Sequence, residues 1–184
     1  MKFSASCGGI HSVVGNDYTF KDARGKCPGD SDPFYDRDTG EQRWAYKERN
    51  EAKSPLLHPG KYEFQADVSI HADKVRHAEW YSIFQIHNGV RDGIPPSMFT
   101  VCQHGRWHID GRDTHVTPKL EFALKVNLEI KENFITVDYY VDEEYLGSSR
   151  TYELAQPFIK FGLYRMKEYC SATQIYKNVR VLIK

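Results

Sequence analysis

Three short segments carry polar side chains at an even spacing, which is the repeat that brings side chains to one face of an extended strand. The pairs are Arg49 with Glu51, Gln85 with His87, and Lys160 with Tyr164. Together they offer a guanidinium, an amide, an imidazole, an ammonium and a phenol to one surface. Such groups can hold a substrate carboxylate and move a proton. The spacing therefore predicts an active-site cleft built from three strands.

The strands that carry these pairs are indicated by alternating apolar and polar residues. The clearest is Lys61–His71, whose apolar residues fall on one face and whose polar residues fall on the other. In 80–88 both faces carry bulky side chains, so this strand is expected between two layers, with Gln85 and His87 at the rim or floor of a cleft. Comparable patterns predict strands or hairpins at 44–53, 98–109, 120–131, 134–147, 158–166 and 173–183.

Residues 1–45 are rich in Gly, Asp and Pro and predict a terminal strand followed by a long ordered loop. No linker divides the chain, and we expect one domain over residues 1–184. No stretch has the periodicity of a helix of three turns or more. Many strands joined by turns, without helical crossovers, predict two antiparallel sheets in a β-sandwich or jelly roll. In such folds one sheet is often concave, and a polymer can lie across it.

The composition is that of a globular domain. Of 184 residues, 40% are hydrophobic and 27% are charged, and the 25 Lys and Arg balance the 25 Asp and Glu. A net charge of zero gives no reason to expect nucleic acid or a membrane surface as a partner, and no apolar run is long enough to span a bilayer. Aromatic residues make up 14% of the chain, an excess that suits both strands and sugar-stacking surfaces.

No metal site is predicted. The four cysteines lack a CxxC spacing, and Cys7 and Cys27 are left as either a disulfide or free thiols. His71, Asp73 and His77 lack a recognisable zinc spacing. Four carboxylates in the N-terminal loop would suit a structural calcium ion, but the glycine and spacing of an EF-hand are absent, and solvated carboxylates are the better expectation. They are Asp30, Asp32, Asp36 and Asp38.

The predicted site suits cleavage of a polyuronic acid by β-elimination. The C5 proton of a uronate becomes acidic enough to remove when its carboxylate is neutralised, and Arg49, Gln85 and His87 could hold that carboxylate. Two routes remain open. If the C5 hydrogen and the leaving oxygen lie on the same side, Tyr164 alone could serve as base and then acid. If they lie on opposite sides, His87 would be the base and Tyr164 the acid.

The three segments also resemble the signature strands of the jelly-roll polysaccharide lyases. The order Arg-x-Glu, then Gln-Ile-His, then Lys-x-Gly-x-Tyr, over about residues 43–168, is similar to that of the alginate lyases of family 7 and of the glucuronan and heparin lyase I families. The segment Gly162-Leu163-Tyr164-Arg165 and the pair Pro95-Pro96 make the last two families the nearer resemblance. Asn50-Glu51-Ala52-Lys53 departs from the family 7 pattern, which favours a substrate rich in glucuronic acid over alginate.

The resemblance implies a concanavalin A-like β-jelly roll, with Arg49 and Gln85 neutralising the carboxylate, His87 as base or neutraliser and Tyr164 as the catalytic phenol. In this pattern Glu51 would orient Arg49. The substrate-binding residues would be Lys160, Glu51, Arg165 and Tyr81. No organic cofactor is expected, and the partner would be an acidic polysaccharide bound by a monomer. The resemblance also implies an extracellular or secreted protein, although the first residues contain no apolar stretch of signal-peptide length.

Other classes of protein remain open. A lectin-like or carbohydrate-binding jelly roll could keep the cleft without turnover, and it would have no use for a phenol at the scissile bond. A glycoside hydrolase would need two carboxylates flanking the bond; Glu63 and Asp67 share a strand face, but no hydrolase motif surrounds them. A polar cluster near 98–109 is a substrate-binding rim or, more simply, a solvated turn. It comprises His104, Arg106, His108, Arg112, Asp113 and His115.

Overall fold

The chain is built from β-strands. The computed structural model describes residues 2–5, 12–21, 31–35, 42–72, 81–87, 97–102, 106–152, 156–166 and 172–184, and no helix occurs within these ranges. The strands are β1 (Ser4–Ala5), β2 (Ser12–Val14), β3 (Asp17–Lys21), β4 (Ser31–Tyr35), β5 (Gln42–Lys53), β6 (Gly60–Ala72), β7 (Tyr81–His87), β8 (Ser97–Cys102), β9 (Arg106–Ile109), β10 (Arg112–Asp113), β11 (Glu121–Ile130), β12 (Ile135–Val141), β13 (Glu144–Thr151), β14 (Phe158–Met166) and β15 (Ala172–Ile183). In this part of the chain no helix could cross a membrane.

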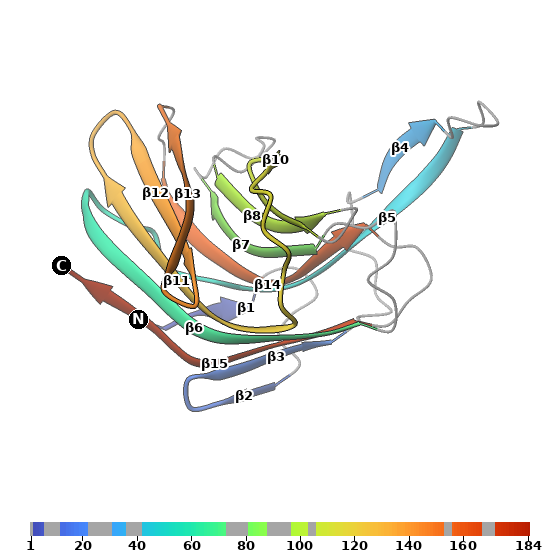
Figure 1. The fold of residues 1–184 in the computed structure, drawn as a ribbon, viewed down its shortest axis with the longest axis horizontal. Helices are drawn as coiled ribbons and strands as arrows, with labels where there is room; N and C mark the ends of the chain where they lie inside the picture. The colour runs from blue at the N-terminus through green and yellow to red at the C-terminus, as the bar shows by residue number, and fades with distance from the viewer. Residues whose placement is uncertain are drawn as a thin grey trace.

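The strands form two antiparallel sheets. Sheet A has the order β1-β5-β14-β7-β8-β9-β10, with β4 also paired to β5, and sheet B has the order β13-β12-β11-β6-β15-β3-β2. Figure 1 shows them as two layers, with β6, β11 and β15 curving beneath β14 and β7. The all-β jelly-roll class predicted from the alternating pattern is confirmed.

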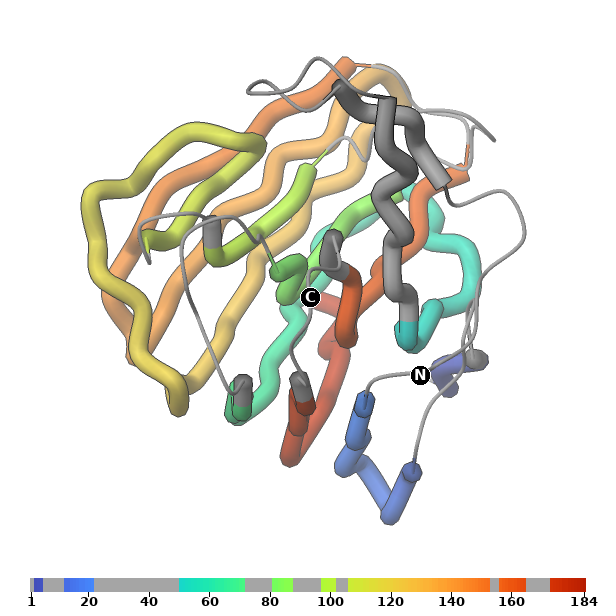
Figure 2. The backbone as a smooth tube through the Cα atoms, turned by 90° about the vertical axis from the view of Figure 1, so that its right-hand side faces the viewer, coloured from blue at the N-terminus to red at the C-terminus, as the bar shows by residue number. Residues whose placement is uncertain are grey.

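The pairings that build the sheets join distant parts of the sequence. In sheet B, β6 and β15 lie side by side, with His71 opposite Thr173, and Figure 2 shows the two strands running together. In sheet A, β14 lies between β5 and β7. Local pattern predicts each strand, but such long-range pairing is decided by packing of the two layers.

An aromatic core joins the two sheets. The Phe161 ring of sheet A lies 5.7 Å from Phe20, 5.3 Å from Phe64 and 4.9 Å from Tyr176, all of sheet B. Burying rings of this size is the main gain in free energy on folding. Because side chains alternate along β14, the neighbours of Phe161 point to the opposite face of sheet A. We call that face, which is turned away from sheet B, the site face.

One predicted residue lies on the wrong side of its strand. Strict alternation placed Tyr81 on the same face as Gln85, but β7 contains a bulge between Ser82 and Phe84 in its pairing with β8. A bulge adds one residue and reverses the faces beyond it. Tyr81 is opposite Val101 and is 1% exposed within the core. Its assignment to substrate binding is therefore corrected to a packing role.

Candidate functional site

The register of sheet A brings the three polar segments together on the site face. In β14, Lys160 is opposite Gln85 of β7 and Lys53 of β5. Two residues further along β14, Gly162 is opposite Glu51. Residues directly opposite in antiparallel strands have neighbouring side chains. The structure thus places Lys160, Gln85 and Glu51 beside one another, as the even spacing predicted.

These three side chains form a buried polar network. The Gln85 amide Nε2 donates to Glu51 Oε1 at 2.6 Å, and Lys160 Nζ lies 3.4 Å from Glu51 Oε2. Glu51 is 0%, Gln85 1% and Lys160 7% exposed. A buried charge is tolerated only when it is paired and hydrogen-bonded. Glu51 therefore holds the amide and the ammonium in place. Its expected role in orienting Arg49 stays a prediction, because the Arg49 side chain lies outside the described part of the chain.

A glycine explains how β5 and β14 approach at this point. Gly162 has φ +123°, and a Cβ atom there would lie 2.5 Å from the carbonyl oxygen of Asn50. No L side chain fits such a contact without moving the backbone. The glycine in the Lys-x-Gly-x-Tyr segment is thus required by the strand pairing that sets Glu51 beside Lys160.

Tyr164 follows Gly162 by two residues in β14 and therefore lies on the same site face. It is opposite Arg49 of β5 and Ser82 of β7 and is 7% exposed. The side chains of Arg49 and Arg165 lie outside the described part of the chain, so their roles remain predictions. The register row continues from Ser82 to Thr100 and then His108. Tyr164 therefore lies within a register row that crosses sheet A from β5 to β9.

Ser82 is a site residue that sequence reasoning missed. Its hydroxyl is buried, and no described group makes a hydrogen bond to it. A buried hydroxyl without a partner is costly, so it is a candidate contact for substrate or water beside Tyr164. Alternation in the sequence would have placed Ser82 on the core face. Only the bulge in β7 turns it toward the site.

His87 is separated from Tyr164 by the buried network. Its ring stacks on Phe158 at 5.2 Å, and Lys53 Nζ lies 4.0 Å from the centroid of the same Phe158 ring. His87 is opposite Phe158 and Tyr164 is opposite Ser82, with an irregularity in β14 between Phe161 and Tyr164. Ser82 and His87 are five residues apart in β7, which corresponds to at most about 17 Å between Cα atoms at the rise of a strand. The imidazole and the phenol therefore stand on opposite sides of Lys160.

Side chains of sheet B form hydrogen bonds with the backbone at the bulge of β7. Tyr176 Oη lies 2.8 Å from the carbonyl oxygen of Ile83 and 2.8 Å from Gln174 Oε1, and Gln174 Nε2 donates to the carbonyl oxygen of Ser82 at 3.3 Å. These bonds satisfy carbonyl groups at the bulge, where the strand ladder is interrupted. Burial raises the pKa of Tyr176, so its phenol stays protonated as a donor.

The polar cluster near β9 has the features of an exposed surface network. Arg106 Nη1 lies 3.0 Å from Asp113 Oδ2, and Asp113 Oδ1 accepts a hydrogen bond from the backbone N–H of His115 at 2.6 Å. The His115 N–H and the Arg106 guanidinium lower the pKa of Asp113. Exposed pairs of this kind contribute little to stability. Of the predicted cluster, His104 lies outside the described residues.

The described residues hold no group of three or more His, Cys, Asp or Glu side chains arranged to bind a metal ion. Several sequence predictions about metals and cysteines fall elsewhere. The side chains of all four cysteines, of the calcium candidates, and of Asp73 and His77 lie outside the described part. The pairing of Cys7 with Cys27 and a structural calcium ion therefore stay predictions.

Comparison with known proteins defines the fold. No protein-family profile and no curated protein sequence matches the chain. Among solved structures, an alginate lyase from Alteromonas sp. 272 is similar with a TM-score of 0.59 at 14% identity, over 100% of this chain and 93% of that one. The chain has the jelly-roll fold of the alginate lyases.

Two further structures show how far this likeness extends. The polysaccharide lyase family 18 protein aly-SJ02 has a TM-score of 0.58 at 14% identity, over 100% of this chain and 94% of that one. A sialidase has a TM-score of 0.52 at 10% identity over 83% of this chain, but the chain spans only 17% of the sialidase. At these identities the likeness concerns the fold, and the chemistry must be argued from the site.

Proposed function

We propose that the protein is a polysaccharide lyase that cleaves a uronic acid-containing polysaccharide by β-elimination. The observation that carries the proposal is the register of β5, β14 and β7, which joins Lys160, Gln85 and Glu51 in one network with Tyr164 on the same face. The alginate-lyase fold of the chain supports it. The network supplies fixed N–H donors, and the phenol supplies a group that can take and return a proton.

The donors would act on the substrate carboxylate. Lys160 and Gln85, together with Arg49, would neutralise it and stabilise the negative charge that develops as the C5 proton leaves. The electrons of the C5–H bond form the C4=C5 double bond as the bond from C4 to the leaving oxygen breaks. That oxygen takes a proton from an acid, so the reaction consumes no water and needs no oxidant. Because Glu51 already orients the amide and the ammonium, little reorganisation is needed when the charge forms.

The position of His87 favours one of the two routes. Side chains stand nearly perpendicular to a sheet, and up to about 17 Å separates the positions of His87 and Tyr164 along the strand direction. A base at His87 and an acid at Tyr164 would both have to lean far along the sheet to reach one glycosidic bond. We therefore propose that the phenolate of Tyr164 takes the C5 proton and that the resulting phenol gives a proton to the leaving oxygen in a syn elimination, with His87 binding substrate.

The substrate we propose is rich in glucuronic acid. This follows from the segment Gly162-Leu163-Tyr164-Arg165 and from the departure at Asn50-Glu51-Ala52-Lys53. Alginate is the direct competitor, because the similar solved structures are named as alginate lyases. We further propose that the enzyme needs no organic cofactor, acts as a monomer over residues 1–184, and works outside the cell.

The test is the ultraviolet absorbance of the unsaturated uronate product. Glucuronan, alginate, heparin-type polymers, hyaluronan and pectic polymers are each incubated with wild type, Tyr164→Phe and His87→Ala. On the accepted polymer, Tyr164→Phe should lower kcat by about 10²- to 10⁴-fold, the usual contribution of a proton-transfer group, with Kd changed less than severalfold. His87→Ala should mainly raise KM, because we propose that His87 binds substrate and does not transfer a proton.

The matched control is Tyr152→Phe, an exposed tyrosine away from the site, which should keep full activity. An equal loss of kcat in His87→Ala and Tyr164→Phe would reject the single-residue route in favour of His87 as base. No absorbance change on any polymer would overturn the lyase proposal.

The second candidate is a carbohydrate-binding module, favoured by one observation. The Glu51, Gln85 and Lys160 side chains are nearly inaccessible and bonded to one another, as they would be in a purely structural network. Under this alternative, a polymer binds in calorimetry without turnover, and Tyr164→Phe has no catalytic effect to remove.

A hydrolase built on Glu63 and Asp67 is not supported. The two residues are four apart in β6, about 13 Å along the strand, which exceeds the roughly 6.5–9.5 Å separation of inverting glycosidases. Glu63 accepts a hydrogen bond from Lys184, and Asp67 accepts one from Asn178. Both carboxylates thus have structural partners in sheet B.

A further inference from the structure

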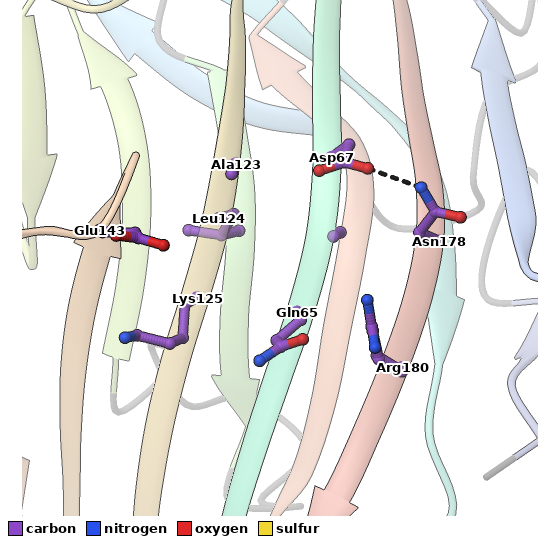
Figure 3. A pocket seen from close by; sticks show the side chains of 9 residues that line it. Gln65, Asp67, Ala123, Leu124, Lys125, Glu143, Asn178 and Arg180 are labelled. Carbon is purple, nitrogen blue, oxygen red and sulfur yellow. Dashed lines mark hydrogen bonds between the residues drawn. The ribbon is translucent and has the colours of Figure 1, made fainter.

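A depression lies on the outer face of sheet B, on the opposite side of the core from the site face. Its volume is about 250 Å³. Figure 3 shows Lys125, Gln65 and Arg180 in a line across neighbouring strands, with Asp67 and Asn178 beside them. The depression is also lined by Glu143 from the turn between β12 and β13. None of these residues belongs to the proposed catalytic machinery.

The strand register extends this line into a row of five side chains. Arg180 is opposite Gln65, Gln65 opposite Lys125, Lys125 opposite Tyr140, and Tyr140 opposite Tyr145. Four strand spacings of about 4.8 Å make the row about 19 Å long. We call these residues the outer row. It is long enough for an extended oligosaccharide and runs across the strands.

The two cations of the outer row have no carboxylate partner in the described part of the chain. Lys125 Nζ lies 4.4 Å from the centroid of the Tyr140 ring, and the described residues form no ion pair with Lys125 or Arg180. The lining also holds the carboxylates Asp67 and Glu143, and the hydrogen bond that Asn178 donates to Asp67 at 2.7 Å leaves the negative charge of Asp67 in place. Cations and carboxylates of the lining therefore balance, and an anionic ligand would be attracted by direct contact with Lys125 and Arg180, not by a net charge of the depression.

The other end of the outer row is aromatic. The Tyr140 and Tyr145 rings lie 5.4 Å apart at an interplanar angle of 58°, and Tyr145 is 54% exposed. Tyrosine offers an apolar ring for the face of a sugar and a hydroxyl for its polar groups. Gln65 lies half-buried between Arg180 and Lys125. Its Nε2 donates to Glu63 Oε1 at 2.6 Å, and its amide oxygen can accept a hydrogen bond from a sugar hydroxyl.

We propose that the outer row is a second, non-catalytic binding site for a carboxylate-bearing oligosaccharide. Arg180 and Lys125 bind carboxylates of the sugar chain, Gln65 bonds its hydroxyls, and the two tyrosines stack on its rings. This proposal is argued from residues of sheet B alone, so it does not depend on whether the protein catalyses β-elimination. It would hold a polyuronate on the outer face of sheet B while leaving the site face free.

The test is a titration of isotope-labelled Tyr164→Phe protein, followed by backbone amide shifts. The probes are glucuronic acid and alginate tetrasaccharides, with a neutral cello-tetraose as control. The acidic probes should give saturable shifts at Gln65, Lys125 and Arg180, separate from any shifts in β5, β7 and β14. The neutral probe should give none there.

Charge variants supply the decisive comparison. Arg180→Gln and Lys125→Gln should each weaken binding at the outer row about fivefold, the usual effect of one exposed charged contact. Glu143→Gln should strengthen binding about twofold, because it removes from the lining a negative charge that repels the carboxylates of the ligand. In the wild-type background, all three variants should keep the turnover number of the unmodified protein.

The result separates the two proposals. No shift at the outer row, equal binding of the neutral probe, or no response to the charge variants would each overturn the outer row as an acidic-glycan site, whatever the ultraviolet assay gives. Absence of turnover with saturable outer-row binding would overturn the lyase proposal alone.

Discussion

The two sheets present the same chemical groups in opposite settings. On the site face a lysine and a glutamine, Lys160 and Gln85, are opposite each other in neighbouring strands. On the outer face of sheet B, Lys125 and Gln65 have the same relation. Lys160 is 7% exposed and is paired with Glu51, whereas Lys125 is half-buried and forms no ion pair with described residues.

This difference shows what burial does to a polar pair. In the buried setting a carboxylate is needed to offset the loss of hydration, and the groups become fixed in one geometry. On the surface the cation keeps part of its hydration and remains able to meet a ligand. Fixed geometry suits chemistry on a bound substrate, and an unpaired surface charge suits reversible binding.

The largest expected effect is on stability at the buried pair. Lys160→Met removes the ammonium that pairs with the buried Glu51 carboxylate, and breaking a buried ion pair costs about 3–5 kcal/mol. The matched variant Lys125→Met removes a half-buried surface charge without an ion-pair partner among the described residues and should change the free energy of unfolding by less than about 0.5 kcal/mol. The free energy of unfolding of both variants is measured by urea unfolding at neutral pH. Equal effects of the two variants would show that burial does not distinguish the two lysines.

A smaller effect is expected at the glycine that lets β5 approach β14. Gly162→Ala places a Cβ atom 2.5 Å from a backbone oxygen at φ +123°, and we expect a loss of about 3 kcal/mol. The control is Gly147→Ala in β13, where the added Cβ would meet the end of the Ile109 side chain at 3.1 Å. That side chain can move, so the loss of about 1 kcal/mol that we expect comes mainly from backbone strain, because Gly147 has φ +150°. A Gly147→Ala loss as large as that of Gly162→Ala would contradict the close approach on the site face.

The smallest effect concerns an exposed pair on the sheet B side. Lys119 Nζ lies 2.5 Å from Asp142 Oδ2, and this bond, with the N–H of Ala123, lowers the pKa of Asp142 below its ordinary value of 3.8. A lowered carboxylate pKa stabilises the fold above the unfolded pKa, and this contribution is lost as the pH falls through the folded pKa. Asp142→Asn should therefore cost about 0.5–1 kcal/mol above pH 5, after allowance for solvent screening.

The stability difference between wild type and Asp142→Asn should also depend on pH, which tests whether this exposed pair acts through its charge. The difference between wild type and Asp142→Asn should shrink below about pH 4 and vanish in stronger acid. Thermal unfolding across this pH range measures it. A difference that stays constant down to pH 2 would mean that the Asp142 carboxylate does not stabilise the fold by its charge.

Much of the fold could be predicted from local pattern. Alternation of apolar and polar residues in Lys61–His71 and 120–131 indicated β6 and β11, because a strand with one buried face requires that period. The N-terminal region was harder: a terminal strand and a long loop were predicted for residues 1–45, and the structure places β1, β2, β3 and β4 there. Short strands leave too few residues for a period to be recognised.

The sequence alone determined which groups are available and which of them share a face: Gln85 with His87, Lys160 with Tyr164. It could not determine which strands are neighbours, since pairing over a hundred residues depends on the packing of the aromatic core between the sheets. The tertiary structure decided that Glu51 bonds Gln85 and Lys160. It also decided, through one extra residue in β7, that Ser82 faces the site and Tyr81 the core, because a bulge changes the side of every residue beyond it.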